Sequence, residues 1–178
     1  MLTECKQFNG TRTVASGSAL LAWLLWLGLA MLPAQSLACR CGWQGSFLSL
    51  ANTAPVIVYA EVLEYTHDDN AMQVRVHDPI KGKLTASRLT VWGDNGMMCR
   101  PPVRQFPVGS RWLFILNGDG SKPAKLGPAQ YAISLCGSHW LAVHAGKVTG
   151  NIEGDSREQS QTMPLDTVLR RIRLQFAQ

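Results

Sequence analysis

The chain has 178 residues and a formal net charge of +5, with 17 Lys and Arg residues against 12 Asp and Glu residues. The basic residues are few and scattered, which argues against nucleic-acid binding. The length suits one domain with a single sizeable core, once the N-terminal segment is removed.

The N-terminal segment, residues 1–38, is typical of a cleaved signal peptide. Its apolar run, residues 19–32, has 14 residues and no charge, whereas a membrane-spanning helix needs about 20. The small residues Ser36 and Ala38 place the predicted cut after Ala38. We therefore expect a mature chain, residues 39–178, that is periplasmic or secreted.

Two alternatives remain open for this segment. An uncleaved anchor helix could extend the apolar run through Ala34. Lipidation of Cys39 would instead leave the protein anchored at the envelope, although Ser36 stands where lipoprotein signals usually carry a large aliphatic residue. Apart from the signal peptide or such a lipid, we expect no association with a membrane.

The predicted cut removes Cys5 and leaves four cysteines: Cys39, Cys41, Cys99 and Cys136. An exported chain with an even number of cysteines is expected to form disulfides, and four cysteines allow three pairings. A bond between Cys39 and Cys41 would be badly strained, because one residue separates them. Each of these two is therefore expected to bind a distant cysteine.

The middle of the mature chain has the composition of β-strands. Residues 54–66 and 71–80 predict a hairpin with one buried face, joined by a polar turn at 67–70. Further strands are predicted at 89–93 and 111–118, and a last pair at 130–137 and 139–152. Residues 93–109 and 118–130 are predicted loops, the second a surface connector between strands. Short strands spaced by about 8 to 12 residues indicate a small barrel or sandwich.

The C-terminal residues 164–176 have the spacing of an amphipathic helix. Pro164 occupies a favoured first helical position, and the polar residues 156–164 before it predict a loop. We expect the helix to pack on the barrel through the apolar residues of one face. These residues are Leu165, Val168, Leu169, Ile172 and Phe176.

No pattern indicates an active site, a bound cofactor or a metal, so we expect a protein that is not an enzyme. Structural zinc prefers cysteines two to four residues apart, and a reactive dithiol usually lies at a helix start. His139 and His144 would face opposite sides of one strand. The adjacent Met97 and Met98 are weak evidence for copper.

Taken together, the motifs resemble the netrin-like domain, whose members include the tissue inhibitors of metalloproteinases. The similarity covers residues 39–145 and lies in the order and spacing of the motifs. They are C-x-C after the signal, VYAEV (58–62), IKG (80–82), TVWG (90–93), a cysteine in the next loop, VGSRWLFIL (108–116) and YAISLC (131–136).

The resemblance implies a five-stranded closed barrel of the oligonucleotide/oligosaccharide-binding type, with flanking helices. It also implies that Cys39 pairs with Cys99 and that Cys41 pairs with Cys136. Each bridge would close a long loop and stabilise the fold by about 3 to 5 kcal/mol.

The resemblance further implies a binding site. In the inhibitors, the N-terminal cysteine chelates the protease's zinc through its α-amino nitrogen and carbonyl oxygen, which implies this role for Cys39. Arg40 would enter the specificity pocket, where its length and charge suit a deep or acidic pocket. Cys41, Met97, Met98 and Cys99 would form the adjoining surface. We call residues 39–41 and 97–99 the N-terminal edge.

Three functions follow as hypotheses. The first is a monomeric, exported inhibitor whose protein partner is a zinc metalloprotease. The second is a non-inhibitory interaction or structural module of the envelope, in which the barrel face or residues 118–130 meet a protein or glycan. The third is a thiol oxidoreductase that uses the C-x-C cysteines.

Overall fold

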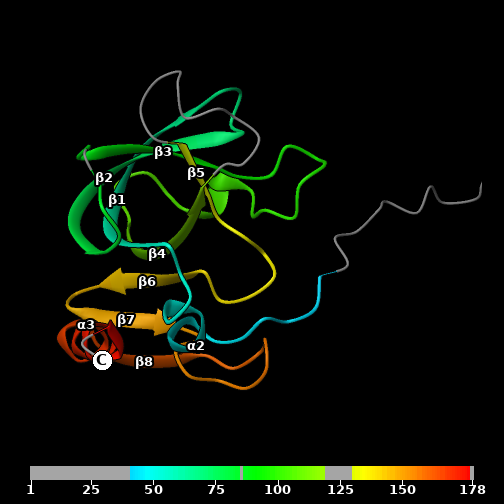
Figure 1. Cartoon of the computed structure of the whole chain (residues 1–178). Helices are drawn as coiled ribbons and strands as arrows, with labels where there is room; N and C mark the ends of the chain where they lie inside the picture. Colours follow the sequence, from blue (N-terminus) through cyan, green and yellow to red (C-terminus); the bar gives the residue numbers. More distant parts are fainter. Residues whose placement is uncertain (1–40, 85, 119–129, 177–178) are drawn as a thin grey trace, which may run out of the picture. The chain divides into compact units, whose positions relative to one another are not determined.

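The computed structural model describes residues 41–84, 86–118 and 130–176, and these residues form a mainly β domain (Figure 1). The elements in chain order are α2 (Phe47–Ala51), β1 (Val56–Thr66), β2 (Ala71–Lys81), β3 (Arg88–Trp92), η1 (Val103–Gln105), β4 (Arg111–Gly118), β5 (Gln130–Ala132), β6 (Trp140–His144), β7 (Lys147–Gly150), β8 (Gln161–Pro164) and α3 (Leu165–Phe176).

Five of the strands close into a barrel in the order β1-β2-β3-β5-β4, and the pairing of β4 with β1 completes the ring. The β3–β5 pair is parallel and the other four pairs are antiparallel. Irregularities in the β1–β2 register let these long strands bend around the barrel. The predicted five-stranded barrel is confirmed.

Strand β4 also carries a second sheet region. One edge of β4 pairs with β5 at Asn117 and Gly118, and with β6 from Arg111 to Phe114. Strands β7 and β8 follow β6 by antiparallel pairing, so the sheet continues beyond the barrel (Figure 1). We call β6, β7 and β8 the sheet extension.

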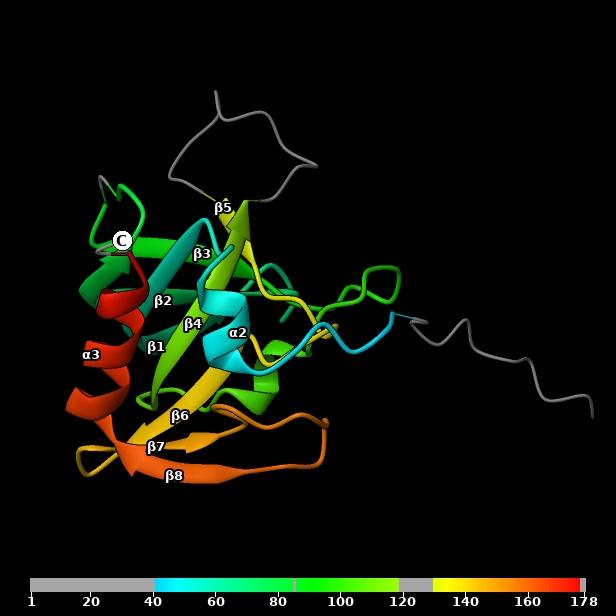
Figure 2. The ribbon, with the colours of Figure 1, turned by 60° about the horizontal axis from the view of Figure 1, so that its bottom comes forward.

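The domain has two hydrophobic cores, one on each face of β1 and β4. Phe114 and Leu116 of β4 point into the barrel with Val58 of β1, whereas Leu113 and Ile115 point to the other side. This second core lies between β1, β4, the sheet extension and the two helices (Figure 2). Because both faces are buried, β1 and β4 read as nearly continuous apolar runs in the sequence.

Helix α3 confirms the amphipathic helix predicted at the C-terminus. Val168 and Ile172 are buried in the second core, and Leu165, Leu169 and Phe176 pack against that core. The helix begins at Leu165 and not at Pro164 as predicted, since Pro164 pairs with β7 as the last residue of β8.

Two local predictions were wrong, and one short helix was not predicted. Residues 161–164, predicted as loop, form the sheet-edge strand β8, and residues 47–51 form the short helix α2. The carbonyl oxygens of Ala51 and Asn52 at the end of α2 accept hydrogen bonds from the Lys81 ammonium at 3.1 and 2.8 Å.

The second wrong prediction concerns the last strand pair. Residues 130–137 do not pair with 139–152. Instead, the short strand β5 pairs with β3 and β4, and β6 forms a hairpin with β7.

Within the described ranges, no helix is both long and apolar enough to cross a membrane.

Two glycines of the quoted motifs occupy positions where a larger residue would clash or be strained. Gly93 of TVWG faces the Pro101 carbonyl oxygen and a Val103 methyl group, and a Cβ there would lie 2.6 Å from each. Gly82 of IKG has a φ of +88°, which favours glycine. Both residues therefore allow close approach of the chain at the ends of strands.

Candidate functional site

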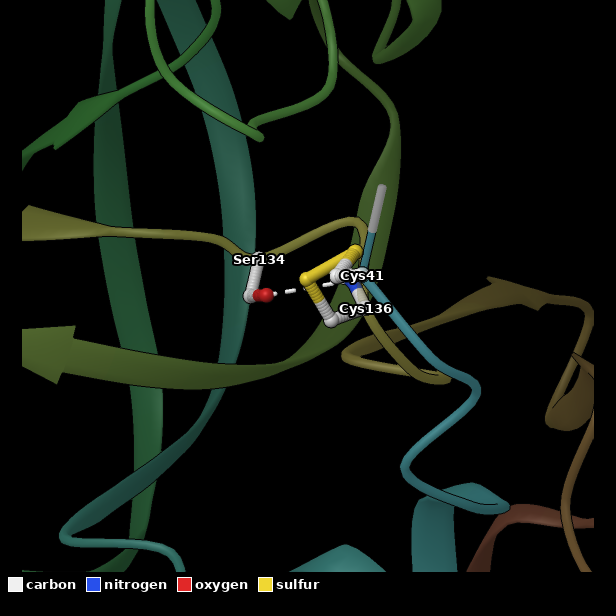
Figure 3. The surroundings of a disulfide bond; sticks show 3 residues. All are labelled: Cys41, Ser134 and Cys136. Atoms are coloured by element: carbon white, nitrogen blue, oxygen red, sulfur yellow. Dashed lines mark hydrogen bonds between the residues drawn. A yellow bond between two sulfur atoms is a disulfide. The ribbon is translucent and has the colours of Figure 1, made fainter. Parts of the chain in front are cut away.

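The N-terminal edge is described from Cys41 onward, and the predicted site residues Cys39 and Arg40 lie outside the described residues. Cys41 is bonded to Cys136, with 5.4 Å between their Cα atoms (Figure 3). The Cys136 amide also donates a hydrogen bond to the Ser134 hydroxyl at 3.1 Å. The implied Cys41–Cys136 pairing is therefore present.

Backbone hydrogen bonds extend this attachment along the segment after Cys41. The Gln44 amide donates to the Cys136 carbonyl oxygen at 2.7 Å, and the Ser138 amide donates to the Gly45 carbonyl oxygen at 3.0 Å. A Cβ on Gly137 would lie 2.7 Å from a Leu50 methyl group, so glycine permits this close packing. Residues 41–46 are thus fixed to the chain that follows β5.

The loop that carries Met97 and Met98 is shaped by its own polar side chains. The Asp94 carboxylate accepts a hydrogen bond from the Gly96 amide at 2.9 Å, and the Asn95 side-chain oxygen accepts one from the Met97 amide at 3.2 Å. Such turns hold the backbone without a strand partner. Met97 is 85% exposed and Met98 is 42% exposed.

Cys41 and the 97–99 segment are both attached at residues 135 and 136. The Leu135 amide donates a hydrogen bond to the Cys99 carbonyl oxygen at 3.0 Å, while the next residue, Cys136, is bonded to Cys41. Cys99 is itself disulfide-bonded, and Cys39, its predicted partner, lies outside the described residues. The structure therefore brings Cys41 and the 97–99 segment to the same part of the fold.

The described residues contain no cluster of three or more His, Cys, Asp or Glu side chains that could hold a metal. His139 is 4% exposed, and its Nδ1 atom has no hydrogen-bond partner. Burial lowers the pKa of His139, and the nearby Gly137 backbone partly opposes this shift. His139 is therefore a packing residue that favours the neutral form.

The structure has a groove of about 360 Å³ that the sequence did not predict. Its walls include Trp43, Trp112 and Trp140, together with the polar residues 157–160. We call it the tryptophan groove. Trp43 follows the C-x-C motif, Trp112 lies on β4 and Trp140 lies on β6. These positions form no sequence motif, so only the residue type could have indicated the groove.

No family model matches the chain, and no curated protein matches it either. The described residues themselves show a closed five-stranded barrel with additional strands, a C-terminal helix and the Cys41–Cys136 bond.

Proposed function

We propose that the protein is an exported inhibitor of a zinc metalloprotease and that Cys39 is its N-terminal residue. In this proposal, Cys39 binds the protease's zinc through its α-amino nitrogen and its carbonyl oxygen. The observation that carries the proposal is the attachment of residues 41–46 and of the 97–99 segment to residues 135–138. This attachment holds Cys41, which follows the proposed zinc-binding residue by two positions, in the same part of the fold as the 97–99 segment.

The chemistry needs a neutral amine and an open zinc position. Catalytic zinc keeps one position for water or substrate, which an amine nitrogen can take. The ordinary pKa of an α-amino group is close to neutral, so loss of the proton costs little. Because the chain is attached from Cys41 onward, little conformational freedom is lost in this segment on binding, which favours affinity.

The described part of the N-terminal edge suits contact with a protein. Met97 and Met98 are exposed apolar side chains on a loop with fixed turns, and methionine adapts its shape to a partner surface. Arg40 follows the proposed chelating residue and would extend into the adjoining pocket. Its positive charge favours a protease whose pocket contains a carboxylate.

The experiment compares two exported proteins, one beginning at Cys39 and one with a single alanine before Cys39. Both are titrated against zinc endopeptidases of the thermolysin and metzincin types, with hydrolysis of a peptide substrate as the readout. We expect the protein that begins at Cys39 to inhibit and the extended protein to lose inhibition, because its α-amino group is displaced from the zinc.

A matched control carries one extra alanine after Gln178 and should inhibit normally. Unfolding by urea should give the same midpoint for all three proteins. Equal inhibition by the protein with alanine before Cys39, or no inhibition by any of them, would overturn the proposal and favour the non-inhibitory envelope module.

A further inference from the structure

We propose that the tryptophan groove binds a linear oligosaccharide and that this binding does not use Cys39. The groove lies on the face of β4 and the sheet extension that is opposite to the helices. Leu141 and Val143 of β6 point into the second core with α2 and α3, so the alternating residues Trp140 and Ala142 point to the groove.

The rings of Trp112 and Trp140 are held in place by contacts with other residues of the domain. The buried ring of Phe106 contacts the Trp112 ring edge-to-face at 5.0 Å and the Trp140 ring at 5.7 Å. The Trp112 indole N–H also donates a hydrogen bond to the Ser110 hydroxyl at 2.6 Å. Both tryptophans are half-buried, so part of each ring remains at the surface. Fixed rings of this kind reduce the entropy lost on binding.

The third tryptophan comes from the segment after Cys41. Trp43 is half-buried, and the Arg157 guanidinium lies 5.8 Å from its ring centre. Residues 39–178 contain four tryptophans, and three of them line this groove. The fourth, Trp92, lies on β3 and stacks with His67.

The polar wall of the groove is the loop between β7 and β8, and its shape is fixed by side chains. The Asn151 side-chain oxygen accepts a hydrogen bond from the Gly154 amide at 2.9 Å. The Gln159 side-chain oxygen accepts one from the Asp155 amide at 2.7 Å. The Gln161 side-chain oxygen accepts one from the Glu153 amide at 2.7 Å. This loop therefore presents Arg157 and Glu158 from a defined backbone.

The groove continues past Trp112. A second depression of about 590 Å³ shares Trp112 and Ala142 with the tryptophan groove and reaches Arg111 and His144. Each volume falls within the range of small-molecule sites, about 300–1,000 Å³. Two depressions joined at one indole ring suit an elongated ligand better than a compact one.

The chemistry of the walls favours a sugar chain. A pyranose ring has an apolar C–H face that packs on an indole ring, and its hydroxyl groups both donate and accept hydrogen bonds. The groove offers the donor Arg157, the acceptor Glu158 and the hydroxyl of Ser160 beside the tryptophans. A proline-rich peptide also packs on aromatic grooves, but its tertiary amides have no N–H to donate to Glu158.

This site differs from the ligand face usual for such barrels, which lies on strands 2 and 3 and adjoining loops. The tryptophan groove instead belongs to β4, the sheet extension and residues 43 and 157–160. The proposed sugar-binding surface is therefore distinct from the usual ligand site of such barrels.

The test is calorimetric titration of the exported protein with cellotetraose, with the β1,4-linked tetramer of N-acetylglucosamine and with a proline-rich decapeptide. We expect at least one tetrasaccharide to bind, and the Trp43→Ala variant to bind it about fivefold to tenfold more weakly. Glu158→Ala changes an exposed residue without touching the core, and we expect it to weaken binding as well.

Leu174→Ala is the matched control, since Leu174 is 61% exposed on α3 and lies outside the groove. It should bind normally, and so should the protein with alanine before Cys39, whatever the outcome of the inhibition assay. Binding of the peptide alone, absence of binding to both tetrasaccharides, or binding unchanged in both groove variants would overturn the proposal.

Discussion

The carbonyl oxygen of Cys99 accepts a hydrogen bond from the Leu135 amide at 3.0 Å, one residue before the cysteine that is bonded to Cys41. Residues 97–99 and the segment after Cys41 thus share one anchor, although about 60 residues separate them in the sequence. Since a flexible N-terminus is a poor ligand, this shared anchor is the structural basis of the proposed inhibition.

Removal of the Cys41–Cys136 bond should lower stability strongly. The bond joins residues 95 positions apart, and the variant Cys41→Ser/Cys136→Ser should lose about 3 to 5 kcal/mol of unfolding free energy. The double change avoids a free thiol. Urea unfolding followed by circular dichroism measures the loss, and an unchanged midpoint would show that the bond contributes little.

Met97 should matter for binding and not for stability. Its side chain is 85% exposed, so Met97→Ala should change the unfolding free energy by less than about 0.5 kcal/mol. We expect it to weaken protease inhibition about tenfold, as a side chain at an interface centre would. Val108→Ala, at a residue 55% exposed outside the N-terminal edge, is the control. Similar inhibition by both variants would remove Met97 from the interface.

Gly93→Ala should destabilise the barrel. The added Cβ would lie 2.6 Å from the Pro101 carbonyl oxygen, and backbone cannot move away cheaply. We expect a loss of about 1 to 3 kcal/mol in urea unfolding. Gly118→Ala is the matched control, because a Cβ at Gly118 meets no atom within 4 Å. A Gly93→Ala protein as stable as this control would contradict the close approach.

Stability should fall when the pH is lowered through the range in which histidine is protonated. Burial lowers the pKa of His139 from its ordinary value of 6.5, so the unfolded chain binds this proton more readily than the folded one. The loss begins as the pH falls below 6.5 and continues toward the lowered pKa, by at most about 1.4 kcal/mol per pH unit.

The measurement for His139 is urea unfolding between about pH 5 and pH 7. His139→Leu should show a smaller decrease of stability over this range than the unaltered protein, because leucine takes up no proton. If both proteins lose the same stability, groups other than His139 cause the pH dependence.

The parts of the fold that could be predicted are those with strong local periodicity. The alternation of Met72, Val74 and Val76 with polar residues predicted strand β2, and the apolar spacing after Pro164 predicted α3. Helix α2 has only five residues, too few to show a helical period. Strand β8 is polar and has the residues Gln161–Pro164, so only its pairing with β7 makes it a strand.

The candidate sites depend on contacts that no local pattern contains. The spacing of the cysteines excluded only the Cys39–Cys41 bond, and the Cys41–Cys136 pairing came from the family resemblance. The tryptophan groove joins residues 43, 112 and 140, which meet because β4 pairs with β6 beyond the barrel. No local pattern predicts the pairing of β4 with β6, so the groove could not be predicted from the sequence.

The mass of the exported protein, measured intact without reduction and again after reduction and alkylation, tests the account most directly. We predict a chain that begins at Cys39, carries no lipid and has two disulfides, so that no thiol reacts before reduction. A chain that retains residues 1–38, a lipid on Cys39, or free thiols would contradict the account, because Cys39 would then have no fixed, free α-amino group with which to bind zinc.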